Sequence, residues 1–248
     1  MKTSARIHGN RCGRQSGLSL ISVMIAILLS TFLLLILFTI WQSTRGTFST
    51  ENSLSDLQGS ERLALTVAAN TVHMAGYYPV YLNYQTPAPA SPYSTNDFAA
   101  SGSFAIGQVI SGTHAAAAPG DTLSVRFIAD SNVNTLDCLG QAETTGTLVT
   151  NTFSVSNSGD FQCSVNGKAP ETIVSGVKAM TVLYGVDTTG SGSALQYLPA
   201  DQLSSKEWSL VNSVKLALTF DNPLAGQAGQ NSTLPPIHSV LALMQNVR

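Results

Sequence analysis

Side chains that commonly carry chemistry are few in this chain and stand far apart in the sequence. The four histidines lack the spacing to cysteine that metal sites use: His8, His73, His114 and His238. The sequence contains no G-x-S-x-G, HExxH, P-loop or dinucleotide-binding motif. Asp187 stands beside a Gly/Ser turn that could suggest a calcium loop, but no series of oxygen ligands follows it. A hairpin turn is the simpler interpretation, so we expect no enzyme, no cofactor and no metal.

The cysteines have one chemical use that depends on their compartment. Cys12 lies near the N-terminus, whereas Cys138 and Cys163 lie far downstream in a polar region. If that region is exported to an oxidising compartment, the two downstream thiols are expected to form one disulfide. Such a bridge would stabilise the fold by roughly 3–4 kcal/mol in the loop-entropy model. The alternative is a pair of unbridged buried thiols.

The charge distribution indicates that part of the chain is not in water. Charged residues make up 10% of the chain and hydrophobic residues 44%, whereas soluble domains average roughly 25% charged residues. Four basic residues precede the first apolar run: Lys2, Arg6, Arg11 and Arg14. The rest of the chain contains 8 basic and 14 acidic residues. The remainder has no basic patch, which disfavours direct binding of nucleic acid.

A long uncharged segment predicts a membrane span. Residues 18–41 contain no charge, and as a helix they would extend roughly 36 Å, enough to cross a bilayer core. The basic residues on the N-terminal side place the N-terminus in the cytoplasm, and Trp41 stands where an interfacial aromatic residue is typical. A plain uncleaved anchor fits these features as well. A secretory signal fits less well, because its apolar region is shorter and ends in a small-residue cleavage site.

The junction Arg14-Gln15-Ser16-Gly17-Leu18 resembles the type III signal of type IV prepilins. The resemblance implies that a membrane prepilin peptidase cuts between Gly17 and Leu18 and N-methylates Leu18. Glycine suits the cut because an unhindered backbone enters a protease readily. Residues 1–17 would then be a cytoplasmic leader that is removed.

The fifth mature position differs from that family's usual pattern. It is Ser22 here, where the family usually has a glutamate thought to meet the amine of a neighbouring subunit. A carboxylate in lipid is costly unless it is paired, whereas serine can bond to a carbonyl of its own helix. Three interpretations remain open: drift at a dispensable site, a subunit at the filament tip that needs no partner above it, and absence of cleavage.

The absence of proline between Leu18 and Pro79 predicts one helix over 18–75, with a membrane part (18–41) and an amphipathic part (42–75). One face of this helix is largely apolar, because its residues recur at steps of three and four: Leu54, Leu57, Glu61, Ala64, Leu65, Ala68, Val72 and Ala75. The sequence of this stretch resembles that of the PilW family of minor pilins at Leu57-Gln58, Arg62, Ala64-Leu65, Ala69 and Met74-Ala75-Gly76-Tyr77. His73 and Asn70-Thr71 depart from that pattern.

Residues 76–248 are expected to form a β-rich head. After a Pro-rich loop with one short strand near 104–110, alternation and branched residues predict strands at 121–128, 148–155, 173–186, 194–198, 214–220 and 239–244. One helical turn over 201–208 would insert Trp208 into the core. Further blocks resemble PilW, around Gly120–Arg126, Leu183–Asp187, Trp208–Leu216 and Val240–Leu243. The family implies an α+β pilin fold, with the long helix laid on a mainly antiparallel sheet.

The resemblance implies a minor pilin in the inner membrane, with a periplasmic head, that enters a surface pilus and helps prime its assembly. Expected partners are other minor pilins, the major pilin, a tip adhesin and the prepilin peptidase. Two other hypotheses remain open: a minor pseudopilin of type II secretion, and a single-span periplasmic adhesion or binding domain. Five tyrosines after the helix suggest either packing of the loop or a contact surface: Tyr77, Tyr78, Tyr81, Tyr84 and Tyr93.

Overall fold

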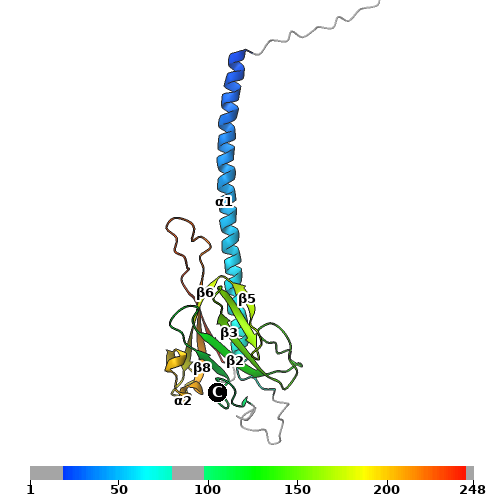
Figure 1. Ribbon diagram of the computed structural model, residues 1–248, viewed down its shortest axis with the longest axis vertical. Helices are drawn as coiled ribbons and strands as arrows, with labels where there is room; N and C mark the ends of the chain where they lie inside the picture. Colours follow the sequence, from blue (N-terminus) through cyan, green and yellow to red (C-terminus); the bar gives the residue numbers. More distant parts are fainter. Residues whose placement is uncertain (1–18, 80–97, 244–248) are drawn as a thin grey trace, which may run out of the picture. The chain divides into compact units, whose positions relative to one another are not determined.

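The fold begins with one long helix. The computed structural model describes residues 19–79 and 98–243, and helix α1 runs from Leu20 to His73 (Figure 1). It ends where Gly76 adopts a positive φ of 73°, a conformation that glycine takes at little cost. Helix α1 therefore covers most of the range 18–75 over which one helix was predicted. The chain forms two compact units, Met1–Asn52 and Ser53–Arg248, so the last third of α1 belongs to the unit that contains the head.

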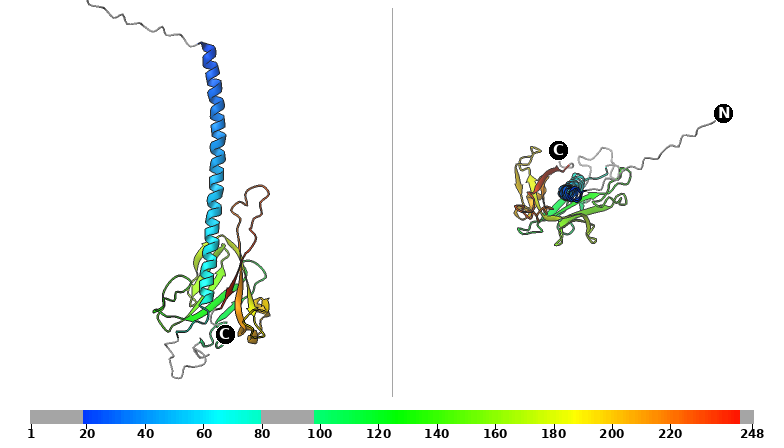
Figure 2. Two further views of the ribbon diagram at one scale, coloured as in Figure 1. Left: turned by 180° about the vertical axis from the view of Figure 1, so that it is seen from behind. Right: turned by 90° about the horizontal axis from the view of Figure 1, so that it is seen from above.

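The last third of α1 packs on the head through the face that the sequence predicts. Ala64, Ala68 and Val72 are completely buried and belong to one hydrophobic core with residues of both sheets. Leu57 and Leu65 pack against the rim of that core. Small side chains at the centre of this face allow the helix to approach the strands closely. Figure 2 shows the end of α1 beside the strands.

Two antiparallel sheets make up the head, where one sheet was expected. The first has five strands in sequential order: β1 (Ile110–Thr113), β2 (Thr122–Ile128), β3 (Leu148–Val155), β4 (Asp160–Val165) and β5 (Glu171–Ser175). The second has four, in the order β7 (Gln196–Leu198), β6 (Val177–Val186), β8 (Val211–Phe220) and β9 (Ile237–Ala242). The long N-terminal helix on antiparallel sheets confirms the predicted α+β class.

The chain passes from one sheet to the other at Gly176. The sequence predicted a single strand over 173–186, and this prediction is wrong because β5 and β6 lie in different sheets. Gly176 has a φ of 83°, which turns the chain out of the first sheet, and its carbonyl accepts a hydrogen bond from the Asp221 N–H at 2.8 Å. A glycine inside a branched run thus marks a corner.

Asp121 joins the two sheets at the start of β2. Its N–H donates to the Met180 carbonyl at 2.9 Å, and its Oδ2 accepts from the Val182 N–H at 2.7 Å. The buried Tyr184 of β6 adds a further link, because its hydroxyl donates to the Ser111 carbonyl of β1. The two sheets therefore share one core.

Three smaller predictions change in detail. Phe104 forms only an isolated bridge with Ser101, and the strand expected near 104–110 is instead β1. The helical turn expected over 201–208 is split into a 3-10 turn η3 (Ala200–Gln202) and helix α2 (Ser205–Trp208). Trp208 is half-buried and meets the Tyr184 ring edge-on at 4.7 Å, so it caps the core instead of entering it.

Candidate functional site: the exposed helix and the disulfide-tethered loop

The first part of α1 exposes an apolar surface that nothing in the described chain covers. Its most apolar window has a mean hydropathy of 2.9 with none of its residues buried, and this is the one described helix long and apolar enough to span a membrane. Large apolar side chains from Leu20 to Trp41 are 40–76% exposed. Such a surface is stable only in a bilayer or against other apolar helices.

Hydroxyl groups inside this segment satisfy their own hydrogen bonds. Ser30, Thr31 and Thr39 each donate to a carbonyl three residues earlier, at 2.9, 2.9 and 2.7 Å. These bonds remove the cost of placing a hydroxyl in an apolar medium. The segment is therefore compatible with lipid despite its polar residues.

Ser22 lies in the first turn of α1 and is exposed. It lines a shallow hollow on the helix surface with Val23, Ala26, Ile27 and Ser30. The position has no charge to offer a neighbouring amine. The expected cleavage at Gly17–Leu18, the methylation of Leu18 and the leader cysteine Cys12 lie outside the described residues.

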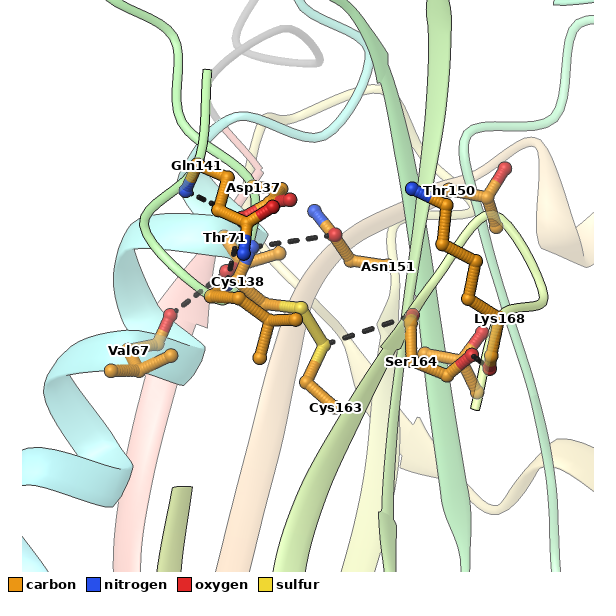
Figure 3. Close-up of a disulfide and its surroundings, with 12 residues drawn as sticks. Val67, Thr71, Asp137, Cys138, Gln141, Thr150, Asn151, Cys163, Ser164 and Lys168 are labelled. Atoms are coloured by element: carbon orange, nitrogen blue, oxygen red, sulfur yellow. Dashed lines mark hydrogen bonds between the residues drawn. A yellow bond between two sulfur atoms is a disulfide. The ribbon is translucent and has the colours of Figure 1, made fainter. Parts of the chain in front are cut away.

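The disulfide between Cys138 and Cys163 is confirmed. The two Cα atoms lie 6.3 Å apart, and both residues are buried (Figure 3). Cys163 belongs to β4, while Cys138 belongs to the loop over residues 129–147 that joins β2 to β3. The bridge therefore fastens this loop across β3 to the middle of the first sheet.

Hydrogen bonds hold the same loop in one conformation. The Asp137 Oδ1 atom accepts from the N–H groups of Leu139 and Gln141 at 2.9 and 2.8 Å. The buried Asp130 accepts from the Asn132 N–H at 2.9 Å and from the Tyr77 hydroxyl at 3.3 Å. The tyrosine just after α1 is thus tied to the loop, which supports packing for Tyr77. Tyr81, Tyr84 and Tyr93 lie outside the described residues.

A groove of about 300 Å³ separates the loop from α1. Val67, Thr71 and Met74 line it on the helix, and Leu136 and Cys138 line it on the loop. Beside it, Figure 3 places Asn151 next to Cys138, whose N–H donates to the Asn151 Oδ1 at 3.4 Å. The Asn151 Nδ2 is buried without a hydrogen-bond partner.

Asp187 lies in the hairpin turn between β6 and β7, and its carboxylate accepts hydrogen bonds from the backbone of that turn. Its Oδ1 accepts from the N–H groups of Thr189, Gly190 and Ser191, and its Oδ2 accepts from Gly192 at 2.6 Å. Burial would raise the pKa of Asp187, but the hydrogen bonds from Gly192, Thr189 and Ser191 outweigh it and lower that pKa. The hairpin interpretation therefore describes this turn better than a calcium loop does.

Two of the described histidines make separate structural contacts. His73 Nδ1 lies 2.8 Å from the Ala242 carbonyl of β9, and His114 Nδ1 lies 2.8 Å from the Asp121 Oδ1. His238 is exposed on β9. Across residues 19–79 and 98–243, no group of three or more His, Cys, Asp or Glu side chains is placed to hold a metal ion.

Arg126 is a buried cation that the sequence analysis missed. It is completely buried, and its guanidinium donates to the carbonyls of Gln108, Ala99, Phe98 and Ala105 at 2.5–3.0 Å. The guanidinium carbon also lies 4.6 Å from the Phe104 ring centroid. Burial lowers the pKa of Arg126 to about 10, so it stays charged at neutral pH. Alternation in β2 had placed this residue on a polar face, and no local signal shows that residues 98–109 cover that face.

A family model matches the chain over much of the head. The model, described as Type IV Pilus-assembly protein W, covers residues 127–235. These residues form a PilW domain. No curated protein and no solved structure gave a match.

The PilW match runs from the end of β2 to just before β9 and includes both bridged cysteines. It confirms the PilW resemblance over these residues, in a family described as a type IV pilus-assembly protein. The α1 helix precedes the matched region, so its role rests on its exposed apolar surface.

Proposed function

We propose that this PilW protein is a minor pilin, made as a membrane-anchored precursor and incorporated at or near the tip of a type IV pilus. One observation carries the proposal: a PilW domain follows an uncovered apolar helix in the same chain. A pilin subunit must pass from the membrane into the filament. The apolar surface of this helix can pack against lipid in the membrane and against neighbouring helices in the filament.

The mechanism is a transfer of the apolar helix between two apolar surroundings. The basic leader keeps the N-terminus in the cytoplasm while the head lies in the periplasm, where Cys138 and Cys163 can oxidise. After cleavage following Gly17, the first part of α1 waits in the inner membrane. It then moves into a filament in which neighbouring helices replace lipid, so its apolar side chains are never exposed to water.

The placement at the tip is supported by Ser22. A subunit that must pair with the amine of a subunit above it gains from a carboxylate in the first turn, despite the cost of that carboxylate in lipid. Ser22 removes both the cost and the pairing. Other minor pilins and the major pilin would then join below this subunit, and an adhesin would sit at its exposed end.

Mass spectrometry of the mature N-terminus tests the proposal. Protein from cells with an active prepilin peptidase should begin at N-methylated Leu18. Gly17→Val, which places a branched side chain at the cut, should retain residues 1–17 as the matched control. A chain that keeps its leader in piliated cells, or that is trimmed near Arg45, would contradict the proposal.

Deletion of the gene tests the role in assembly. Surface pili and twitching should be lost or strongly reduced, and the wild-type gene should restore both. Normal piliation in a clean deletion strain would count against a priming role while leaving the processing of Leu18 intact.

A further inference from the structure

Three residues on one face of α1 form a distinct surface at the end of the apolar segment. Phe38, Trp41 and Arg45 follow one another at steps of three and four, so they share one side of the helix. The Phe38 and Trp41 ring centroids lie 6.0 Å apart, and the Arg45 guanidinium carbon lies 4.8 Å from the Trp41 ring centroid. We call these three residues the aromatic–arginine stripe.

Arg45 has no acidic neighbour on its own helix. The positions three and four residues away are Trp41, Gln42, Phe48 and Ser49. The nearest acidic residue along the described helix is Glu51, six residues on and therefore on a different face. The residues of the described chain give Arg45 a ring contact and no ion pair. Its hydrogen-bond donors remain available to an anion from outside the chain.

We propose that the aromatic–arginine stripe binds phospholipid headgroups of the periplasmic leaflet, with the Arg45 guanidinium donating to lipid phosphate. This inference rests on the proposed function, because it takes residues 18–41 as the membrane span. It adds a ligand class and a fixed depth for the helix before the subunit enters a filament.

The depth of Arg45 matches that of the phosphates. Residues 18–41 extend roughly 36 Å as a helix, against a hydrocarbon core about 30 Å thick. With Trp41 at the boundary of the core, the excess of about 6 Å lies at the cytoplasmic end, and Arg45 lies about 6 Å beyond Trp41 on the periplasmic side. The headgroup region adds about 5–8 Å on each side. The guanidinium therefore lies at the level where phosphate is the abundant anion.

The stacked geometry also fits a headgroup. Tryptophan favours the membrane interface because its ring is apolar while its N–H is polar. The guanidinium lies over the Trp41 ring, a contact that uses none of its N–H donors, so these donors can form the fork that matches two phosphate oxygens. The alternative partner is a carboxylate of a neighbouring subunit, which would act only after assembly.

Trp41 fluorescence in vesicles tests the proposal. The chain has two tryptophans, so the full chain with Trp208→Phe reports Trp41 alone. In phosphatidylcholine vesicles, lipids brominated near the headgroup should quench Trp41 more than lipids brominated near the bilayer centre. Arg45→Gln should lower this ratio, because the neutral helix can sink. Arg45→Lys, which keeps the charge but loses the fork, should give an intermediate ratio.

Two comparisons isolate the phosphate contact. Arg62→Gln, at an exposed position of the same helix inside the head unit, should leave the ratio unchanged. In vesicles of digalactosyldiacylglycerol, which has no phosphate, Arg45→Gln should leave the quenching ratio of Trp41 unchanged. An unchanged ratio for Arg45→Gln in phosphatidylcholine would overturn the proposal, and an equal change in the galactolipid would overturn its phosphate part. If reduced incorporation into pili accompanied the unchanged ratio, it would assign Arg45 to a protein partner. N-methylated Leu18 would be detected in each of these cases, so failure here is distinct from failure of the pilin function.

Discussion

Arg126 shows how one buried side chain can organise a segment that has little regular structure. Four carbonyls between Phe98 and Gln108 accept hydrogen bonds from this guanidinium. Arg126→Met keeps an apolar stem but leaves those carbonyls without donors, so we expect a loss of at least about 2 kcal/mol of unfolding free energy. Urea denaturation of the full chain in detergent measures the loss. Lys178→Met, at an exposed position, should change it little, and equal effects of the two changes would contradict this role.

The Asp187 turn should make the head sensitive to acid. Because hydrogen bonds lower the pKa of Asp187 in the fold, its contribution is present above the unfolded pKa of about 4 and is lost as the pH falls through the folded value. Asp187→Asn should therefore destabilise the head near neutral pH and reduce the fall of its melting temperature in acid. Circular dichroism across the acidic range measures both effects, and Asp201→Asn at an exposed position is the control. If the melting temperature of Asp187→Asn falls with decreasing pH as steeply as that of the wild-type protein, this explanation is wrong.

Among the elements, the loop over residues 129–147 depends most on its covalent tether. Cys163→Ser should cost about 3–4 kcal/mol, because the 25-residue separation no longer restricts the unfolded chain. The double change Cys138→Ser with Cys163→Ser should cost no more than the worse single change, since one bond is lost in each case. Thermal unfolding measures the cost, and a non-reducing gel should show the mobility difference disappear. An undiminished melting temperature in both variants would show that the hydrogen bonds of Asp137 and Asp130 suffice.

The sequence allowed the helix to be predicted more fully than the sheets. Periodicity along α1 identified Ala64, Ala68 and Val72, because a helix face is a local property of the chain. The division into two sheets depends on the turn at Gly176, which lies inside residues 173–186, where the sequence pattern predicts one continuous strand. The strand β4 was missed because six residues between turns carry little signal. Arg126 depends on a covering segment distant in sequence, which no local pattern reveals.

At the scale of the whole molecule, a head with one shared core is attached to a helix segment that has no cover of its own. The disulfide stabilises the head in an oxidising compartment, and the uncovered segment requires an apolar one. A membrane whose far side is oxidising would meet both requirements, as the proposed function expects. The fold thus restricts where the chain is stable, and this restriction agrees with the proposed assembly route.

The strongest test of that restriction is a charge at the middle of the uncovered segment. Leu29 and Leu33 are each 59% exposed, so arginine at either position disturbs no packing within the chain. Each arginine should cost about 2.5–3.5 kcal/mol of insertion into a bilayer, and Leu29→Arg with Leu33→Arg should release the chain from membranes washed with carbonate. Leu63→Arg, at a position 47% exposed on the same helix within the head unit, is the matched control and should stay membrane-bound. Retention of the double variant would mean that protein contacts, not lipid, hold the chain at the membrane.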